Sequence, residues 1–182
     1  NEIFLKRDKK DYLVSSKIFD GSTILDEILT GDNDEGVSRF FNNLNSKFKI
    51  NMDKVFIDDS YFLKSLQSDV NFNKNNLVNL NLSGNFADNK KLVLSIRTNE
   101  NNEKITTLFA ENAKPLVKKY KFIKGFEGGY LDFYSIKKNN LSKSKLKIND
   151  FKLKEVPALT KILTLASLQG IADLLTGEGI RF

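Results

Sequence analysis

Apolar and polar residues alternate through the middle of the chain, from Lys47 to about Thr107. Turn-forming residues interrupt the alternation at 58–59, 73–76, 88–89 and 99–102. Successive side chains of a β-strand lie on opposite faces of the sheet, so this pattern predicts an antiparallel meander with one dry face and one wet face. The apolar positions of its clearest runs are Phe48, Ile50 and Met52, then Val78, Leu80 and Leu82, then Leu92, Leu94 and Ile96.

Two strands and two helices are predicted before the meander. Residues 3–19 contain short apolar clusters separated by charged residues, which is typical of short strands. Residues 24–29 and 37–44 carry apolar residues at helical spacing, and Gly31 follows the first of these stripes. Each stripe predicts a short helix.

After the meander, the sequence predicts a helix at 112–120, a turn at 125–129, a strand at 130–136 and another strand that begins at Ser144. Pro115 falls in the first turn of the helix, where its missing N–H does no harm. In the last strand, Leu146 and Ile148 are out of phase with Phe151 and Leu153. A β-bulge near 149–150 is therefore expected, because it would place all four on one face.

The segment 156–175 contains only two charged residues and is about as long as a membrane-spanning helix. A stripe of Thr and Ser at helical spacing argues against a span, and Gly170 breaks the helical phase. We therefore expect a kinked pair of helices, 157–168 and 171–175. Its apolar residues are Leu159, Ile162, Leu163, Ala166, Ile171, Leu174 and Leu175.

This helix pair has two interpretations. As a cap, it covers apolar edges at one end of the sheet. As an amphipathic element, it touches a membrane surface. The cap is favoured, because Lys and Arg do not flank the apolar face as they do in most interfacial helices.

The 182 residues suffice for one sizeable domain. The chain contains no Cys and no His, which removes disulfides and the most common general base and transition-metal ligand. No nucleophile–base pair or metal cluster is apparent, so neither enzymatic activity nor a cofactor or metal is expected. The net charge of +6 is carried mostly by Lys interleaved with Asp and Glu, a pattern that does not indicate nucleic-acid binding.

The chain begins without Met, and it ends within a glycine-containing pattern at 177–182. We expect it to be a single segment, residues 1–182, of a longer protein. Any signal sequence or membrane anchor would then lie outside it.

A family resemblance covers roughly residues 123–182. The stretches that carry it are IKGFEGGYL at 123–131, LKINDFKL at 146–153, VPALTKILTLASLQGI at 156–171 and ADLLTGEGI at 172–180. Their order and spacing resemble the C-terminal region of the AsmA-like (YhdP-like) family. The upstream residues resemble the family's β-rich body in general character.

This resemblance implies a bacterial envelope protein, anchored to the inner membrane outside this segment and projecting into the periplasm. It implies a bridge-like lipid transfer protein whose curved sheet forms an apolar groove and carries phospholipid between the inner and outer membranes. The implied partners are phospholipid acyl chains, the membranes at the ends of the full-length protein and the rest of the same chain. No catalytic residues are implied.

The fold class expected is therefore β-rich (α+β): a curved, twisted antiparallel sheet that forms an open groove, with short helices. Two functions stay open. In the first, acyl chains lie on the apolar face; in the second, that face is an ordinary core and the chain is a structural or assembly module for outer-membrane biogenesis. The candidate groove residues are Phe48, Ile50, Met52, Val78, Leu80, Leu82, Leu92, Leu94, Ile96, Leu131 and Phe133.

Overall fold

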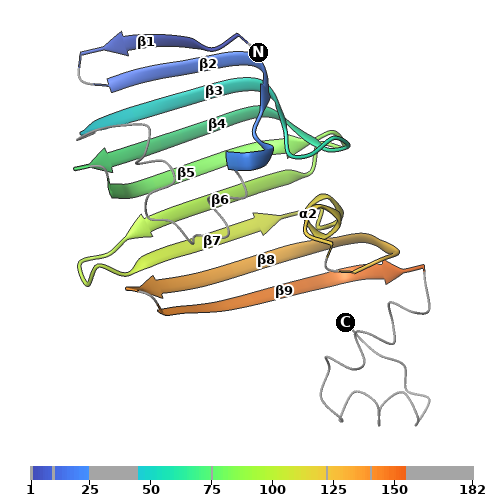
Figure 1. Ribbon diagram of the computed structural model, residues 1–182. Coiled ribbons are helices and arrows are strands. Elements are labelled where there is room, and N and C mark those ends of the chain that lie inside the picture. Colours follow the sequence, from blue (N-terminus) through green and yellow to red (C-terminus); the bar gives the residue numbers. More distant parts are fainter. Residues whose placement is uncertain are drawn as a thin grey trace.

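The computed structural model describes residues 2–9, 11–24, 45–74, 76–121, 123–139 and 141–154. These residues form one open, curved sheet of nine strands that neighbour one another in chain order (Figure 1). The strands are β1 Phe4–Asp8, β2 Asp11–Asp20, β3 Ser46–Phe56, β4 Phe62–Asn73, β5 Asn76–Phe86, β6 Lys91–Thr98, β7 Lys104–Ala110, β8 Phe126–Lys138 and β9 Leu141–Leu153. The helix α2, Lys114–Lys119, lies in front of one end of the sheet in this view, and residues 22–24 are also helical.

The sheet is mixed, so the expectation of a wholly antiparallel sheet is wrong at one place. Strands β2 and β3 pair in parallel, with Tyr12 opposite Phe48, and every other neighbouring pair is antiparallel. A parallel pair needs a connection of a dozen or more residues to return the chain to the same end of the sheet. The connection here, residues 21–45, is long enough. Short turns join the antiparallel strands, except β7 and β8, whose connection at residues 111–125 contains α2.

The predicted meander is confirmed by β3 to β7, and the predicted helix at 112–120 is confirmed by α2, with Pro115 in its first turn. Strands β8 and β9 begin earlier than expected. Gly128 and Gly129 lie within β8 and not in a turn, so that expectation is corrected. The predicted helices at 37–44, 157–168 and 171–175, and the 24–29 helix beyond Ile24, lie outside the described residues.

Direct cross-strand pairing joins one position from each strand, apolar in eight of the nine, into a single line that we call the central row. Paired residues of neighbouring strands share a face, so the row defines an apolar face of the sheet. Eight inter-strand spacings of about 4.8 Å give it a length of about 38 Å. The row consists of Leu5, Val14, Ile50, Ser68, Leu82, Leu94, Leu108, Phe133 and Leu146.

Left-handed residues change the phase of the alternation near the α2 end. Ser65 has φ +50° beside a register shift between β4 and β5, so Leu66 and Leu63 are both buried although they are three positions apart. The predicted β-bulge near 149–150 does not form, because the pairing of β9 with β8 keeps one register across this point. Asp150, with φ +54°, changes the phase of β9 instead. Beyond it, Phe151 joins Ile148 against the core, as that prediction required.

The core is a single cluster that combines the apolar face with α2. Leu94 is 0 % exposed and Leu92 is 1 % exposed, at the centre of the sheet. Leu116 and Val117 of α2 belong to the same cluster. The polar face on the reverse side carries residues such as Lys49 and Asn81 in the corresponding positions.

We expect Leu94→Ala to lower the free energy of unfolding by about 3 kcal/mol, because it leaves a cavity in a fully buried site. Ser95→Ala is the matched control, since Ser95 is the next residue of β6 and lies on the polar face. The control should change stability by less than about 0.5 kcal/mol. Urea unfolding followed by circular dichroism measures both, and equal stabilities for the two variants would contradict the burial of the apolar face.

A glycine pair in β8 provides a second comparison. Both residues have left-handed backbones, with φ +70° at Gly128 and +73° at Gly129. A Cβ on Gly129 would lie 2.9 Å from the Asn149 carbonyl oxygen and from the Phe151 Cβ, whereas a Cβ on Gly128 would meet nothing nearer than 3.8 Å. Gly128→Ala should therefore cost about 1–2 kcal/mol of unfolding free energy, the price of the left-handed backbone. Gly129→Ala should lower the unfolding free energy by more than Gly128→Ala does. If the urea assay found Gly128→Ala to be the more destabilising variant, this prediction would be wrong.

Candidate functional site

The apolar face is the candidate site, and its central row is interrupted by one polar residue. Ser68 stands between Ile50 and Leu82 in the row. Its Oγ is the buried side-chain polar atom that has no hydrogen-bond partner among the described residues. A buried hydroxyl without a hydrogen-bond partner destabilises the folded state. A ligand or water that reaches the Ser68 Oγ would therefore gain a hydrogen bond there.

Ten of the eleven candidate groove residues belong to the core cluster or pack against it. The exception is Val78, which lies at a register shift where Phe72 pairs with Leu77 and Asn71 with Asn79. Leu77 packs against the cluster in its place. The extra residue of this bulge is not visible in the alternation of the sequence, so the sequence indicates Val78 in place of Leu77.

Burial along the central row changes from the edges to the centre. Leu5 in β1 is 62 % exposed, Leu94 in β6 is fully buried, and Leu146 in β9 is 44 % exposed. Ile50 and Phe133 are half-buried. The centre of the apolar face is therefore packed within the protein, and the two margins are open to contact.

A second line of side chains, nearer the turn that joins β8 and β9, changes from apolar to hydroxyl-bearing residues. Ile96 in β6 pairs with Thr106 in β7, and Ser135 in β8 pairs with Ser144 in β9. The Ser144 hydroxyl donates to the Ser135 Oγ at 2.9 Å, and the Ser142 and Ser135 oxygens lie 3.1 Å apart. The apolar margin at Phe133 thus adjoins a cluster of hydroxyl groups.

Helix α2 covers the opposite end of the apolar face. Ala113, Leu116 and Val117 are fully or almost fully buried in the core cluster. The Ala113 N–H donates to the Gly129 carbonyl, which ties the start of α2 to β8. The sequence predicts this helix at 112–120 but favours the C-terminal helix pair as the end cover, and that pair lies outside the described residues.

Lys119 joins α2 to two other segments at this end. Its Nζ donates to the Ser22 carbonyl at 3.1 Å and to the Ile57 carbonyl at 3.0 Å. The pKa of the neighbouring Asp20 carboxyl lies below its ordinary value, chiefly because the Ser22 N–H and hydroxyl donate to it, and Lys119 adds a smaller electrostatic lowering. One cation therefore holds the end of β2, the β3–β4 loop and α2 together.

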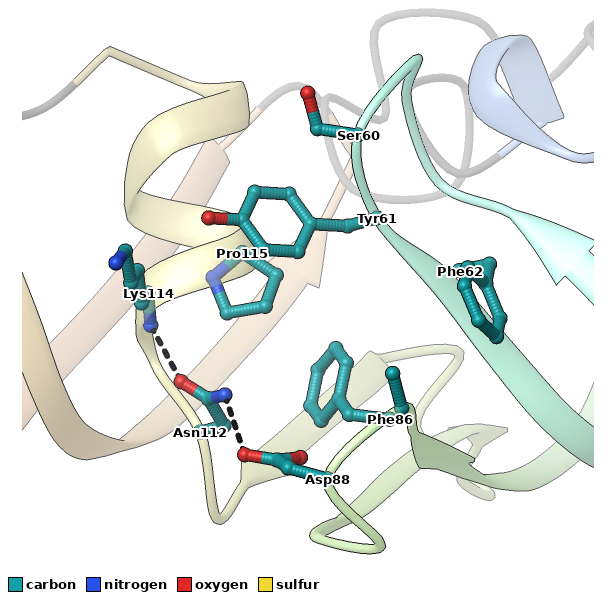
Figure 2. A pocket seen from close by; sticks show the side chains of 9 residues that line it. Ser60, Tyr61, Phe62, Phe86, Asp88, Asn112, Lys114 and Pro115 are labelled. Atoms are coloured by element: carbon teal, nitrogen blue, oxygen red, sulfur yellow. Dashed lines mark hydrogen bonds between the residues drawn. The ribbon is translucent and has the colours of Figure 1, made fainter.

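A hollow of about 260 Å³ lies at the rim of this end (Figure 2). Asn112 connects its two sides: the Asn112 Nδ2 donates to Asp88 at 3.0 Å, and the Asn112 Oδ1 accepts from the Lys114 N–H at 3.2 Å. No candidate groove residue lines this hollow. Its lining is Ser60, Tyr61, Phe62, Phe86, Ala87, Asp88, Asn112, Lys114 and Pro115.

The described part of the chain holds no group of three or more acidic residues arranged to bind a metal ion. Within the same ranges, no helix combines the length and the apolar character needed to cross a bilayer. No protein-family model matches the chain, and neither curated proteins nor solved structures show significant similarity to it. The arrangement of the apolar face is therefore the basis for assigning a function.

We expect Lys119→Met to lower the free energy of unfolding by about 1–3 kcal/mol, because it leaves two carbonyl groups without their donor. Lys118→Met is the control: the Lys118 Nζ lies 5.2 Å from the centre of the Tyr61 ring at the surface, a contact worth less than about 1 kcal/mol. Urea unfolding compares the two variants. A Lys119 variant as stable as the Lys118 variant would contradict the role of this cation.

Proposed function

We propose that the chain is a segment of a bridge-like lipid transfer protein of the AsmA-like kind, which carries phospholipid between the inner and outer membranes. In this proposal the apolar face forms a groove for acyl chains, and the segment works in the periplasm, held to the inner membrane through a part of the protein outside it. The supporting observation is the central row, which carries apolar side chains on eight of nine successive strands.

The physical need for such a row follows from the lipid. Each methylene exposed to water costs about 0.8 kcal/mol, so a tail in transit needs an uninterrupted apolar surface. The row crosses the strands and so runs along the sheet for about 38 Å, and its surface is apolar except at Ser68. The margin at Phe133 is half-buried and adjoins the hydroxyl groups of Ser135 and Ser144, which are suitable hydrogen-bond partners for a phospholipid head group.

A second candidate function is a structural or assembly module for outer-membrane biogenesis. The observation that favours it is the complete burial of Leu92 and Leu94 at the centre of the apolar face. In that case the face is a core and lipid does not enter it. The two functions differ in what contacts the half-buried positions of the row.

Photocrosslinking distinguishes lipid transfer from a structural role. A photoreactive amino acid is placed at Ile50, Leu82 or Phe133 in the full-length protein in cells, and phospholipid adducts are identified by mass spectrometry. Lipid transfer predicts adducts at all three positions, because acyl chains lie against them.

The controls are the neighbouring polar-face positions Lys49, Asn81 and Tyr134, which differ from the test positions by one residue along the same strands. They should give no adduct above background. Lipid labelling that is absent at Ile50, Leu82 and Phe133, or equal on the two faces, would reject lipid transfer and favour the structural module.

A further inference from the structure

Three polar side chains are buried in the described part of the chain, and Ser68 differs from the other two in its hydrogen bonding. Ser16 is 5 % exposed, Ser68 6 % and Ser135 9 %. The Ser16 Oγ lies 2.8 Å from the carbonyl oxygens of both Glu2 and Ile18, and the Ser135 Oγ belongs to the hydroxyl cluster near the β8–β9 turn. Among the described residues, the Ser68 Oγ has no hydrogen-bond partner.

The surroundings of Ser68 explain why its hydroxyl lacks a partner. Ile50 and Leu82 lie directly opposite it on the neighbouring strands, and Leu66 and Val70 lie two positions away on the same face of β4. None of these four apolar side chains can accept a hydrogen bond, so the hydroxyl is left for a molecule that enters the apolar face. Alanine would fill nearly the same volume without a buried polar atom, so packing does not require the hydroxyl.

Ser68 also lies on the path that a lipid along the central row would take. Ile50 and Leu82 are half-buried, so a molecule that contacts both of them passes directly over Ser68. The serine side chain is shorter than either neighbour, which places its hydroxyl below them. Leu82 can turn between staggered rotamers, and such a turn uncovers the hydroxyl.

We propose that the Ser68 hydroxyl donates a hydrogen bond to the ester carbonyl of a phospholipid bound along the central row. This inference rests on the proposed lipid transfer and adds a specific contact to it. The ester carbonyl is a neutral acceptor joined directly to the acyl chain, so it reaches this position while the tail stays on the apolar surface.

The other polar groups of a lipid fit this position less well. A phosphate, or the carboxylate of a free fatty acid, would bring a charge among Leu66 and Val70, where the described residues place no cation to pair with it. A neutral carbonyl carries no such penalty and satisfies the one hydroxyl that needs a partner. The surroundings of Ser68 therefore favour an ester over an anion.

A single neutral hydrogen bond changes affinity by roughly three- to tenfold. That is enough to give a bound lipid a preferred position, with its ester linkage at β4, and too little to prevent its onward movement. Ser68 would thus set the register of the lipid on the row without trapping it.

Ether-linked lipids test the contact, because they have the same chains and head group but no ester carbonyl. The purified chain is incubated with vesicles that contain equal amounts of diester and diether phosphatidylcholine with identical chains. The protein is then separated by gel filtration, and the lipid that elutes with it is quantified by mass spectrometry. The native chain should enrich the diester lipid roughly three- to tenfold, and Ser68→Ala should bind both lipids equally.

Ser16→Ala is the matched control, since Ser16 is a buried serine whose hydroxyl already lies within hydrogen-bond distance of carbonyl groups of the chain. This variant should keep the preference for the diester lipid. A native chain that binds both lipids without preference would overturn the role of Ser68 and leave lipid transfer intact. A native chain that binds neither lipid would reject both lipid transfer and the ester contact.

Stability without lipid gives a second test. Ser68→Ala removes a buried hydroxyl that has no partner, so it should unfold at the same or a higher urea concentration than the native chain. Ser16→Ala removes a hydroxyl that has partners, so its urea midpoint should fall. If Ser68→Ala lowered the midpoint as much as Ser16→Ala does, the Ser68 hydroxyl would have a partner within the protein, and the proposal would be wrong.

Discussion

The structure depends on removing one face of a single sheet from water. Nine strands contribute apolar side chains to the same side, and the central residues Leu92 and Leu94 lose almost all contact with solvent. Burial of each such side chain contributes about 1.5–3 kcal/mol, which makes this face the main source of stability. The strands and α2 together form one continuous apolar cluster on this face of the sheet.

The end of the sheet near α2 shows how this continuity is maintained. There the strict alternation fails, because left-handed residues at Ser65, Gly129 and Asp150 shift the phase of their strands. The shifts return apolar residues such as Leu63 and Phe151 to the core side, where α2 packs. A local departure from regular geometry thus extends the common core to the edge of the sheet.

Much of the fold was predictable from the sequence because alternation encodes which face a side chain occupies. It predicted the meander from β3 to β7 and put residues such as Leu80 and Ile96 on the apolar face, where the structure buries them in the core. Alternation does not encode strand direction, so the parallel pairing of β2 with β3 was missed. It also does not reveal an extra residue in a strand, so the alternation indicates Val78 where Leu77 packs.

The candidate site was predictable to the same extent and for the same reason. The sequence identified the apolar residues but not their degree of burial, which depends on curvature and on α2. Leu94 and Phe133 have the same character in the sequence, yet one is fully buried and the other half-buried. Burial of this kind arises from contacts between residues far apart in the chain, which local patterns do not record.

The order of strands has a consequence for how such proteins change over evolution. Each strand pairs with its immediate neighbours along the chain, so the sheet is nearly one-dimensional. Duplication or loss of a hairpin at an edge therefore changes the length of the apolar surface by about 10 Å without disturbing the packing elsewhere. The number of hairpins therefore sets the length of the apolar surface, and evolution can change that length by one hairpin at a time.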